Sequence, residues 1–235
     1  MFPLGDIKLL KLGILLLAFF AAARAYGQET VFDVPSPDVL DKGKVYGELD
    51  GTVHPMDSMY TFTPRVVLGI GHQIEIGLNF DGLNAFKSNH LALSPTIKWR
   101  IWRREESGWS IYAGDDLFFP IRNRTYNAGN YLYSALVKEW KEGTRISAGG
   151  YDFTRNVVAA ANRAGGQFTF EQRITNRLTL AAEWYTGNHA AGYVNPGAIF
   201  KVTSKLTAYA AYQIGNAGVT AGNHMFLYEL GYNFN

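Results

Sequence analysis

Residues 223–234 read NHMFLYELGYNF, and the character of the side chains alternates at every second position. One set is bulky and apolar, and it comprises Phe226, Tyr228, Leu230, Tyr232 and Phe234. The intervening set includes Glu229, Gly231 and Asn233. Because successive side chains of a β-strand point to opposite faces of the sheet, this stretch predicts a strand with one apolar face and one mainly polar or small face.

The same alternation recurs along most of the chain from Lys44 onward, and no stretch of a dozen residues carries a helical apolar stripe. Short connections alternate with longer ones that are rich in Gly and Asn. Breaks at Gly, Pro, Asn and charge clusters predict twelve strands, at residues 43–53, 59–70, 73–81, 90–102, 109–118, 130–140, 144–154, 165–174, 178–187, 193–202, 206–215 and 223–234.

Composition narrows the fold further. The 235 residues are 47% hydrophobic and 18% charged and include no cysteine. The chain is too apolar for disorder and too polar for a bundle of membrane helices, each of which needs about 20 consecutive apolar residues. An even number of strands with alternately short and long connections is typical of a transmembrane barrel, whose sheet must close because lipid cannot satisfy free strand edges. We therefore expect an all-β, closed antiparallel transmembrane β-barrel of about 12 strands, with about 10 or about 14 as alternatives.

The N-terminal region has the pattern of a secretory signal. Lys8 and Lys11 precede the uncharged run Leu12–Ala23, and small residues stand at Ala23 and Ala25. This pattern predicts cleavage near Ala25. The expected organisation is a signal peptide at residues 1–25, a periplasmic N-terminal arm or plug-like tail at residues 26–42, and the transmembrane β-barrel at residues 43–235.

Net charge excludes one class of partner. Without residues 1–25 the chain has 19 basic and 19 acidic residues and is formally neutral. Binding of nucleic acid requires a clustered positive surplus that neutralises phosphates, and the predicted mature chain has none. We expect no nucleic-acid partner.

The second face of the strands carries charges of both signs, and in a barrel this face lines the lumen. We predict that a path for small solutes is lined by Glu48, Arg65, Lys98, Arg100, Glu183 and Glu229. The wider inward set includes Asp50, Glu75, Asp81, Asp116, Lys138, Arg145, Glu171 and Lys201. These charges either form salt bridges that hold a filled barrel together or orient solutes that diffuse passively through an aqueous conduit. Small lumen residues such as Gly114, Gly197 and Gly231 favour the conduit.

Aromatic residues are expected to gather at the two membrane interfaces. The predicted loop-side set includes Tyr60, Phe62, Phe80, Tyr131, Tyr133, Phe168, Trp184 and Tyr193, and the turn-side set includes Trp99, Trp109, Phe200, Tyr232 and Phe234. Prolines oppose the strand assignment because each removes a ladder donor. Pro95 and Pro196 lie near strand ends, where a bulge is tolerated, whereas Pro64 is central and the pattern does not explain it.

The sequence offers little catalytic chemistry. No His precedes a Ser by two residues, no metal-ligand cluster appears, and no cofactor is expected. Ser88 and His90 are close in sequence, so a lipid hydrolase acting at the membrane surface remains an alternative. A structural barrel with a plugged lumen and a soluble exported β-barrel binder are two further alternatives.

The signal segment, the twelve alternating segments and the aromatic end of the last strand resemble a Gram-negative outer-membrane β-barrel. This resemblance implies outer-membrane lipids as surroundings and both termini in the periplasm. It also implies that Tyr232 and Phe234 form the signal for the barrel-assembly machinery, although Asn235 follows Phe234. Residues 32–40, with the Lys42-Gly43-Lys44 that follows, resemble the start of transporter-like barrels associated with the meta-pathway of phenol degradation, which implies hydrophobic substrates.

Overall fold

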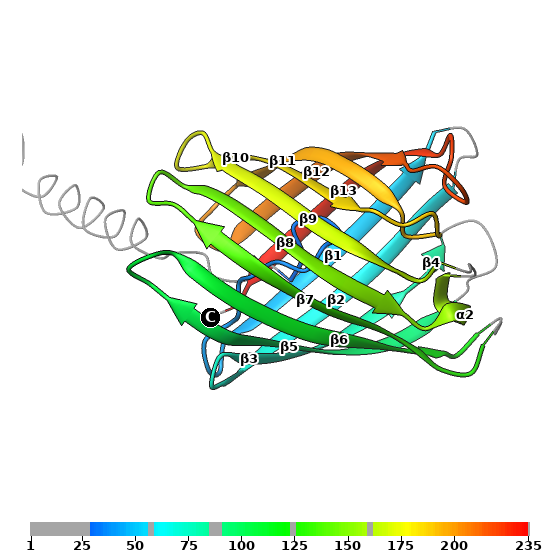
Figure 1. Cartoon of the computed structure of the whole chain (residues 1–235), viewed down its shortest axis with the longest axis horizontal. Coiled ribbons are helices and arrows are strands. Elements are labelled where there is room, and N and C mark those ends of the chain that lie inside the picture. The colour runs from blue at the N-terminus through cyan, green and yellow to red at the C-terminus, as the bar shows by residue number, and fades with distance from the viewer. Residues whose placement is uncertain (1–28, 56–58, 85–90, 123–125, 159–161, 235) are drawn as a thin grey trace, which may run out of the picture.

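The computed structural model describes residues 29–55, 59–84, 91–122, 126–158 and 162–234. Within these ranges twelve long strands form one closed antiparallel sheet (Figure 1). They are β1 (Val45–His54), β2 (Met59–Gly71), β3 (Ile74–Asp81), β5 (Ala92–Arg104), β6 (Trp109–Pro120), β7 (Gly129–Glu139), β8 (Thr144–Phe153), β9 (Ala164–Arg173), β10 (Leu178–Tyr185), β11 (Tyr193–Lys201), β12 (Leu206–Gly215) and β13 (His224–Asn233). The predicted twelve-stranded barrel is confirmed.

Each strand pairs with its neighbours in sequence, and β1 pairs with both β2 and β13, which closes the barrel. The two-residue strand β4 (Leu83–Asn84) continues β3 past Gly82 and pairs with β2. The short helix α2 (Arg155–Val158) follows β8. No helix among the described residues is long and apolar enough to cross a membrane.

The two ends of the barrel differ. The short hairpins, such as β7–β8, lie at the end where the chain terminates, which we call the turn end (Figure 1). The longer connections, such as those that follow β8 and β12, lie at the opposite end, which we call the loop end. Because the connections alternate, every second residue of each strand faces the lumen from a defined height between these ends.

The outward face of the sheet is apolar. Leu49, Val66, Ile97, Leu136 and Phe226 are all more than 40% exposed. A water-soluble barrel would bury this face, because exposed apolar surface of this extent is unfavourable in water. The outward face therefore matches the hydrocarbon layer that surrounds a membrane-spanning barrel.

The three strand prolines share one structural feature that the sequence pattern did not reveal. Each lies where the pairing with one neighbouring strand is interrupted, so its missing N–H removes nothing from a continuous ladder. Pro64 lies in a gap in the β2 pairing between Phe62 and Arg65, Pro95 in a gap in the β5–β6 pairing between Leu93 and Thr96, and Pro196 in a gap in the β11–β12 pairing between Val194 and Gly197.

Several predicted side-chain directions are wrong. Tyr131, Tyr133 and Tyr193 point into the lumen instead of forming an outer aromatic girdle, because they share the inward parity of their strands and are at least 90% buried. Lys138 points outward, with its ammonium above the rings of Trp109 and Trp140 at 5.3 and 5.4 Å.

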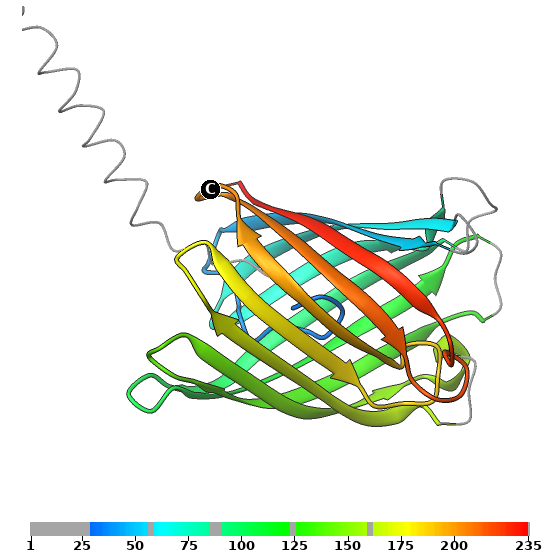
Figure 2. The same cartoon turned by 90° about the horizontal axis from the view of Figure 1, so that it is seen from above.

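The lumen is occupied by residues 29–42, which we call the arm (Figure 2). Val31, Phe32, Val34 and Ser36 of the arm are fully buried. The arm folds back on itself through a single bridge between Thr30 and Pro35 and adds no strand to the barrel. The barrel wall therefore closes without it.

Candidate functional site

The candidate site is the contact between the arm and the lumen wall. Glu183 of β10 lies at its centre, because this single carboxylate accepts hydrogen bonds from three consecutive backbone N–H groups of the arm. The N–H groups of Phe32 and Val34 donate to Oε2 at 3.0 and 2.9 Å, and that of Asp33 donates to Oε1 at 2.7 Å. Three backbone N–H groups that converge on one side chain hold the backbone between Phe32 and Val34 in a single conformation, so Glu183 fixes the loop of the arm.

Wall residues around Glu183 complete this anchor. Asn195 donates both to Glu183, at 2.6 Å, and to the carboxylate of Asp33, at 3.0 Å. Gln213 also donates to Asp33, and the hydroxyl of Tyr185 donates to the Asp33 carbonyl at 3.1 Å. Asp33 is thus held through both its side chain and its backbone.

A second anchor lies towards the turn end. Arg145 of β8 pairs with Asp38 of the arm at 2.9 Å and with Glu171 of β9 at 2.8 Å. Arg100 of β5 donates to the carbonyl of Pro37 at 2.9 and 3.2 Å. The guanidinium groups of Arg145 and Arg100, on two different strands, therefore hold the part of the arm at Pro37 and Asp38.

Lys98 and Glu75 form a third contact. Their side chains pair at 2.8 Å and are both almost completely buried. Lys98 also donates to the Glu29 carbonyl at 3.1 Å, and Glu75 accepts from the Leu40 N–H at 2.8 Å. The pair therefore joins the two ends of the arm to the same side of the wall.

Apolar packing supports these polar contacts. Phe32 lies in a buried cluster with Ile199, Tyr209 and Leu227. A Cβ built at Gly197 would lie 2.6 Å from Cζ of Phe32, so only glycine leaves room for this ring. We predicted that lumen glycines leave space for solutes, but at Gly197 the space is taken by the arm. At Gly231 it is taken by the ring of Tyr46.

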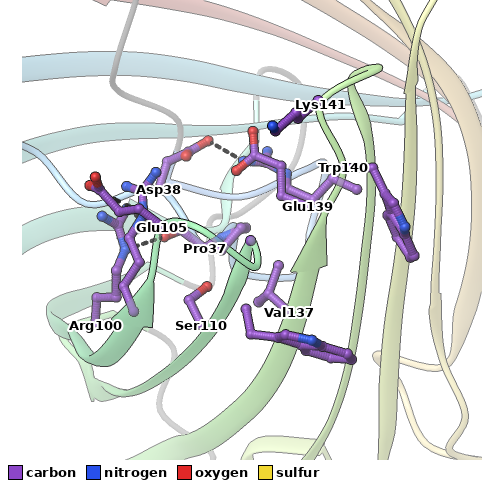
Figure 3. A pocket seen from close by; sticks show the side chains of 13 residues that line it. Pro37, Asp38, Arg100, Glu105, Ser110, Val137, Glu139, Trp140 and Lys141 are labelled. Carbon is purple, nitrogen blue, oxygen red and sulfur yellow. Dashed lines mark hydrogen bonds and ion pairs between the residues drawn. The ribbon is translucent and has the colours of Figure 1, made fainter.

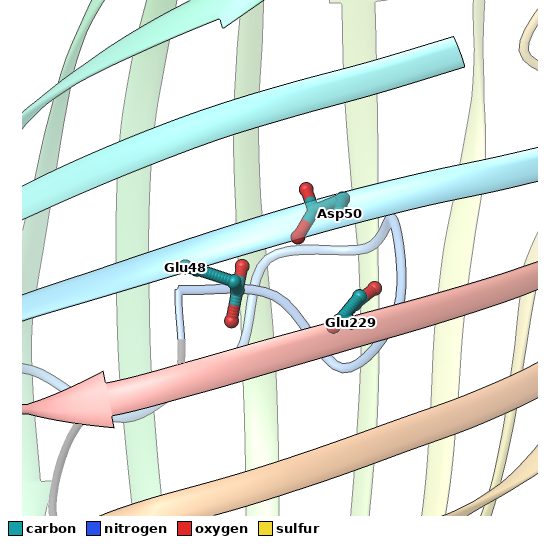
Figure 4. Close-up of side chains that lie close together, drawn as sticks. All are labelled: Glu48, Asp50 and Glu229. Atoms are coloured by element: carbon teal, nitrogen blue, oxygen red, sulfur yellow. The ribbon is translucent and has the colours of Figure 1, made fainter. Parts of the chain in front are cut away.

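An acidic cluster lies in the middle of the wall (Figure 4). Carboxylate oxygens of Glu48 and Asp50 on β1 and of Glu229 on β13 lie within 4.8 Å of one another. Arg65 of β2 faces the cluster, with its Nε 2.5 Å from Asp50 and 4.0 Å from Glu48. Oxygens at this spacing could coordinate a hard cation, but Arg65 already supplies a positive charge, and we assign no metal.

The predicted solute-path residues are thus brought together only in part. Glu48, Arg65 and Glu229 meet in the acidic cluster, whereas Lys98, Arg100 and Glu183 lie elsewhere and bind the arm. Sequence reasoning missed Asp33 and Asn195, because their contacts join residues 162 positions apart.

Two of the cavities lined by described residues lie towards opposite ends of the arm. The turn-end cavity, of about 350 Å³, is bordered by charges of both signs that include Asp38, Arg100 and Glu139 (Figure 3). The loop-end cavity, of about 280 Å³, is bordered by the arm residues Thr30 and Asp33. Because arm residues border both cavities, the arm lies between them.

The predicted assembly-signal residues lie at the C-terminal end of the described chain. Tyr232 and Phe234 point outward near the β1–β13 pairing, with ring centroids 5.0 Å apart, and the N–H of Phe234 donates to the Val45 carbonyl at 3.1 Å. Their role as an assembly signal stays a prediction. Ser88 and His90 lie outside the described residues.

Solved structures share this barrel fold. The NanC porin has a TM-score of 0.56 and 12% sequence identity, covering 80% of this chain and 99% of its own. Outer membrane phospholipase A from Escherichia coli has a TM-score of 0.48 and 12% identity, covering 84% and 94%. The likeness to NanC shows a common fold and nothing about function, and the likeness to the phospholipase is weaker still. No family model and no curated protein matches the sequence.

Proposed function

We propose that this protein spans the bacterial outer membrane, with both termini in the periplasm, and passes small solutes by passive diffusion through its lumen when the arm shifts. The apolar outward face supports the membrane location. The arrangement of the arm supports the channel. It lies between two cavities, and it can move without breaking the ladder of the barrel, because it contributes no strand.

The contacts of the arm agree with a plug that opens reversibly. Its anchors are hydrogen bonds and ion pairs to Glu183, Arg145, Arg100 and Lys98, and breaking them leaves the strand pairing of the wall intact. The charged side chains of the lumen then have two roles. In the resting state they bind the arm, and in the open state they line the path of the solute.

Conductance in planar bilayers tests this proposal. The natural chain is expected to be closed most of the time, with brief openings. Glu183→Gln replaces one acceptor oxygen by a donor group and weakens the central anchor, so its openings should be about tenfold more frequent. Glu142→Gln, in an exposed turn, is the matched control and should behave like the natural chain.

Heat-dependent mobility in gels establishes that each variant is folded. If neither the folded natural chain nor folded Glu183→Gln conducts, the channel proposal is wrong and the barrel is a plugged structural one. Equal opening rates for Glu183→Gln and Glu142→Gln would contradict the role of the arm as a plug.

We also propose that the chain is not an enzyme. The hydrolase alternative depends on Ser88, and Ser88→Ala would abolish hydrolysis of phospholipid vesicles if that alternative were correct. The hydrophobic substrates implied by the resemblance of residues 32–44 remain a prediction, and uptake assays with phenolic compounds would test it.

A further inference from the structure

The loop-end cavity has more acidic than basic side chains in its lining. Asp33, Asp81 and Asp116 border it, and Arg65 is the only basic residue among the described residues of its lining. The charge of Arg65 is already met by Asp50, whose carboxylate lies 2.5 Å from Nε. The cavity therefore has three acidic groups without a cationic partner of their own.

The three carboxyl groups differ in their hydrogen-bond donors. Asp33 accepts hydrogen bonds from Asn195 and Gln213, and Asp81 accepts one from Ser94. Asp116 is different, because within the described part of the chain it accepts no hydrogen bond and forms no ion pair. A carboxylate in this position attracts a charged donor.

A second observation points the same way. Asn79 of β3 borders the cavity, is only 4% exposed, and its Oδ1 has no hydrogen-bond partner among the described residues. A buried acceptor without a donor costs free energy that a ligand N–H group would recover. Asn79 thus adds an unsatisfied acceptor to the cavity that Asp116 borders.

Aromatic rings form much of the rest of the lining, which includes Phe118, Tyr131, Phe153, Tyr185 and Tyr193. Rings of this kind pack against the hydrocarbon part of a small ligand and attract cations through their faces. The volume of about 280 Å³ is at the lower end of the range of small-molecule sites, so the ligand must be compact.

We propose that the loop-end cavity binds a compact organic cation, an ammonium group on a small hydrocarbon, with Asp116 and Asn79 accepting its N–H bonds. This inference names a ligand class for the proposed channel. It rests on the proposed function only in treating the ligand as a solute on its way into the lumen. Binding itself requires only the cavity.

Calorimetry on the full chain, folded in a nonionic detergent, tests the proposal with three probes of similar size. The probes are cyclohexylammonium, cyclohexanol and cyclohexanecarboxylate, which carry positive, zero and negative charge. Only cyclohexylammonium is expected to bind. Magnesium chloride, added as a competitor at matched ionic strength, should not displace it, because a strongly hydrated ion gains nothing from an aromatic lining.

Two neighbouring residues supply the matched variants. Asp116→Asn removes the inward carboxyl group, which a bound cation would keep ionised, and should weaken cyclohexylammonium binding about tenfold. Asp115→Asn changes the next residue of β6, which lies between the outward residues Ile97 and Leu132 of adjacent strands, and should leave binding unchanged. If Asp116→Asn does not fold, Asp81→Asn tests the same acidic lining.

Equal binding of cyclohexanol and cyclohexylammonium would overturn the proposal, as would displacement by magnesium, which would indicate a metal site. An unchanged affinity in folded Asp116→Asn would also overturn it. The outcome is separable from that of the channel. Binding without conductance supports the site and contradicts the channel, whereas conductance without binding contradicts the site alone.

Discussion

At the scale of single residues, the most consequential side chains are buried charges that hold the arm. Arg145 is the clearest case, because one guanidinium pairs with both Asp38 of the arm and Glu171 of the wall. Removing such a group leaves two carboxylates buried without a cation, and this is more costly than removing a complete ion pair.

We therefore expect Arg145→Met to lower the free energy of unfolding by about 3–5 kcal/mol. Urea-dependent tryptophan fluorescence of the protein in detergent measures this loss. Arg163→Met is the control, because the pair of Arg163 with Asp152 is about half exposed and should contribute about 1 kcal/mol or less. Similar losses in the two variants would show that Arg145 does not act through burial.

His189, in the connection between β10 and β11, makes local stability depend on pH. Its ring is fully buried, Nδ1 accepts from the Ala191 N–H at 3.2 Å, and Nε2 lies 2.7 Å from the Tyr151 hydroxyl. Burial lowers the pKa of His189 below its ordinary value of 6.5. The folded connection thus binds a proton less readily than the unfolded one.

The sign of the effect follows from linkage. The contribution of His189 is fully present above pH 6.5 and is lost as the pH falls from there towards the lowered pKa. The protection factors of residues 186–192, which are corrected for the intrinsic pH dependence of amide exchange, should fall over this interval in the natural chain and not in His189→Gln. His72→Gln, in the β2–β3 turn, serves as the control and should retain this fall. A flat profile in the natural chain would contradict this account.

At the scale of the strands, the sequence was highly informative. The predicted strand at 206–215 coincides with β12, and the others differ from the structure by a few residues. Alternation is a local signal that a lipid-facing strand must carry, so it can be recognised without knowing the partner strand. Tyr131 and Tyr133 were placed wrongly because a tyrosine suits either an interface or a lumen that offers a partner for its hydroxyl.

Proline tolerance is a prediction at this scale. Pro196 lies in a pairing gap, so Pro196→Ala should change the free energy of unfolding by about 1 kcal/mol or less. Ala210 is itself paired on both sides, with Ala198 and Tyr228, so Ala210→Pro removes a ladder donor and places its ring at a paired position, which should prevent folding. The heat-dependent gel shift distinguishes these outcomes, and a folded Ala210→Pro barrel would contradict the reasoning.

At the scale of the whole molecule, charge is distributed along the barrel axis. The described lumen residues near the loop end include Asp33, Asp81, Asp116 and Glu183, whereas Lys98, Arg100 and Arg145 lie from mid-barrel towards the turn end. The sequence showed both signs, but it did not show the separation of the acidic loop end from the paired charges of mid-barrel and the turn end, which depends on the height of each residue in the wall. The sequence left open whether the arm lies in the periplasm or plugs the lumen, because Phe32 and Glu183 are 151 residues apart and their contact has no local signal.

This separation predicts the selectivity of the open state. In a potassium chloride gradient, the open state of Glu183→Gln should prefer potassium to chloride, because the entrance at the loop end is acidic. Adding Asp116→Asn should move the reversal potential towards zero, and adding Asp115→Asn should not. A preference for chloride would contradict the assignment of the acidic entrance.

The closure of β1 on β13 also restricts the order of assembly. The residues that β1 and β13 pair, such as Asp50 and Glu229, are the most distant in sequence of all paired strand residues. The entropy cost of loop closure is therefore largest here, and we expect this pairing to form last. Until β1 and β13 pair, the curved sheet is open and exposes the carboxylate of Glu183. The arm is continuous with β1 and can bind to the open sheet from the side. We therefore expect the barrel to close around an arm that is already bound, so that the arm does not have to enter a closed lumen.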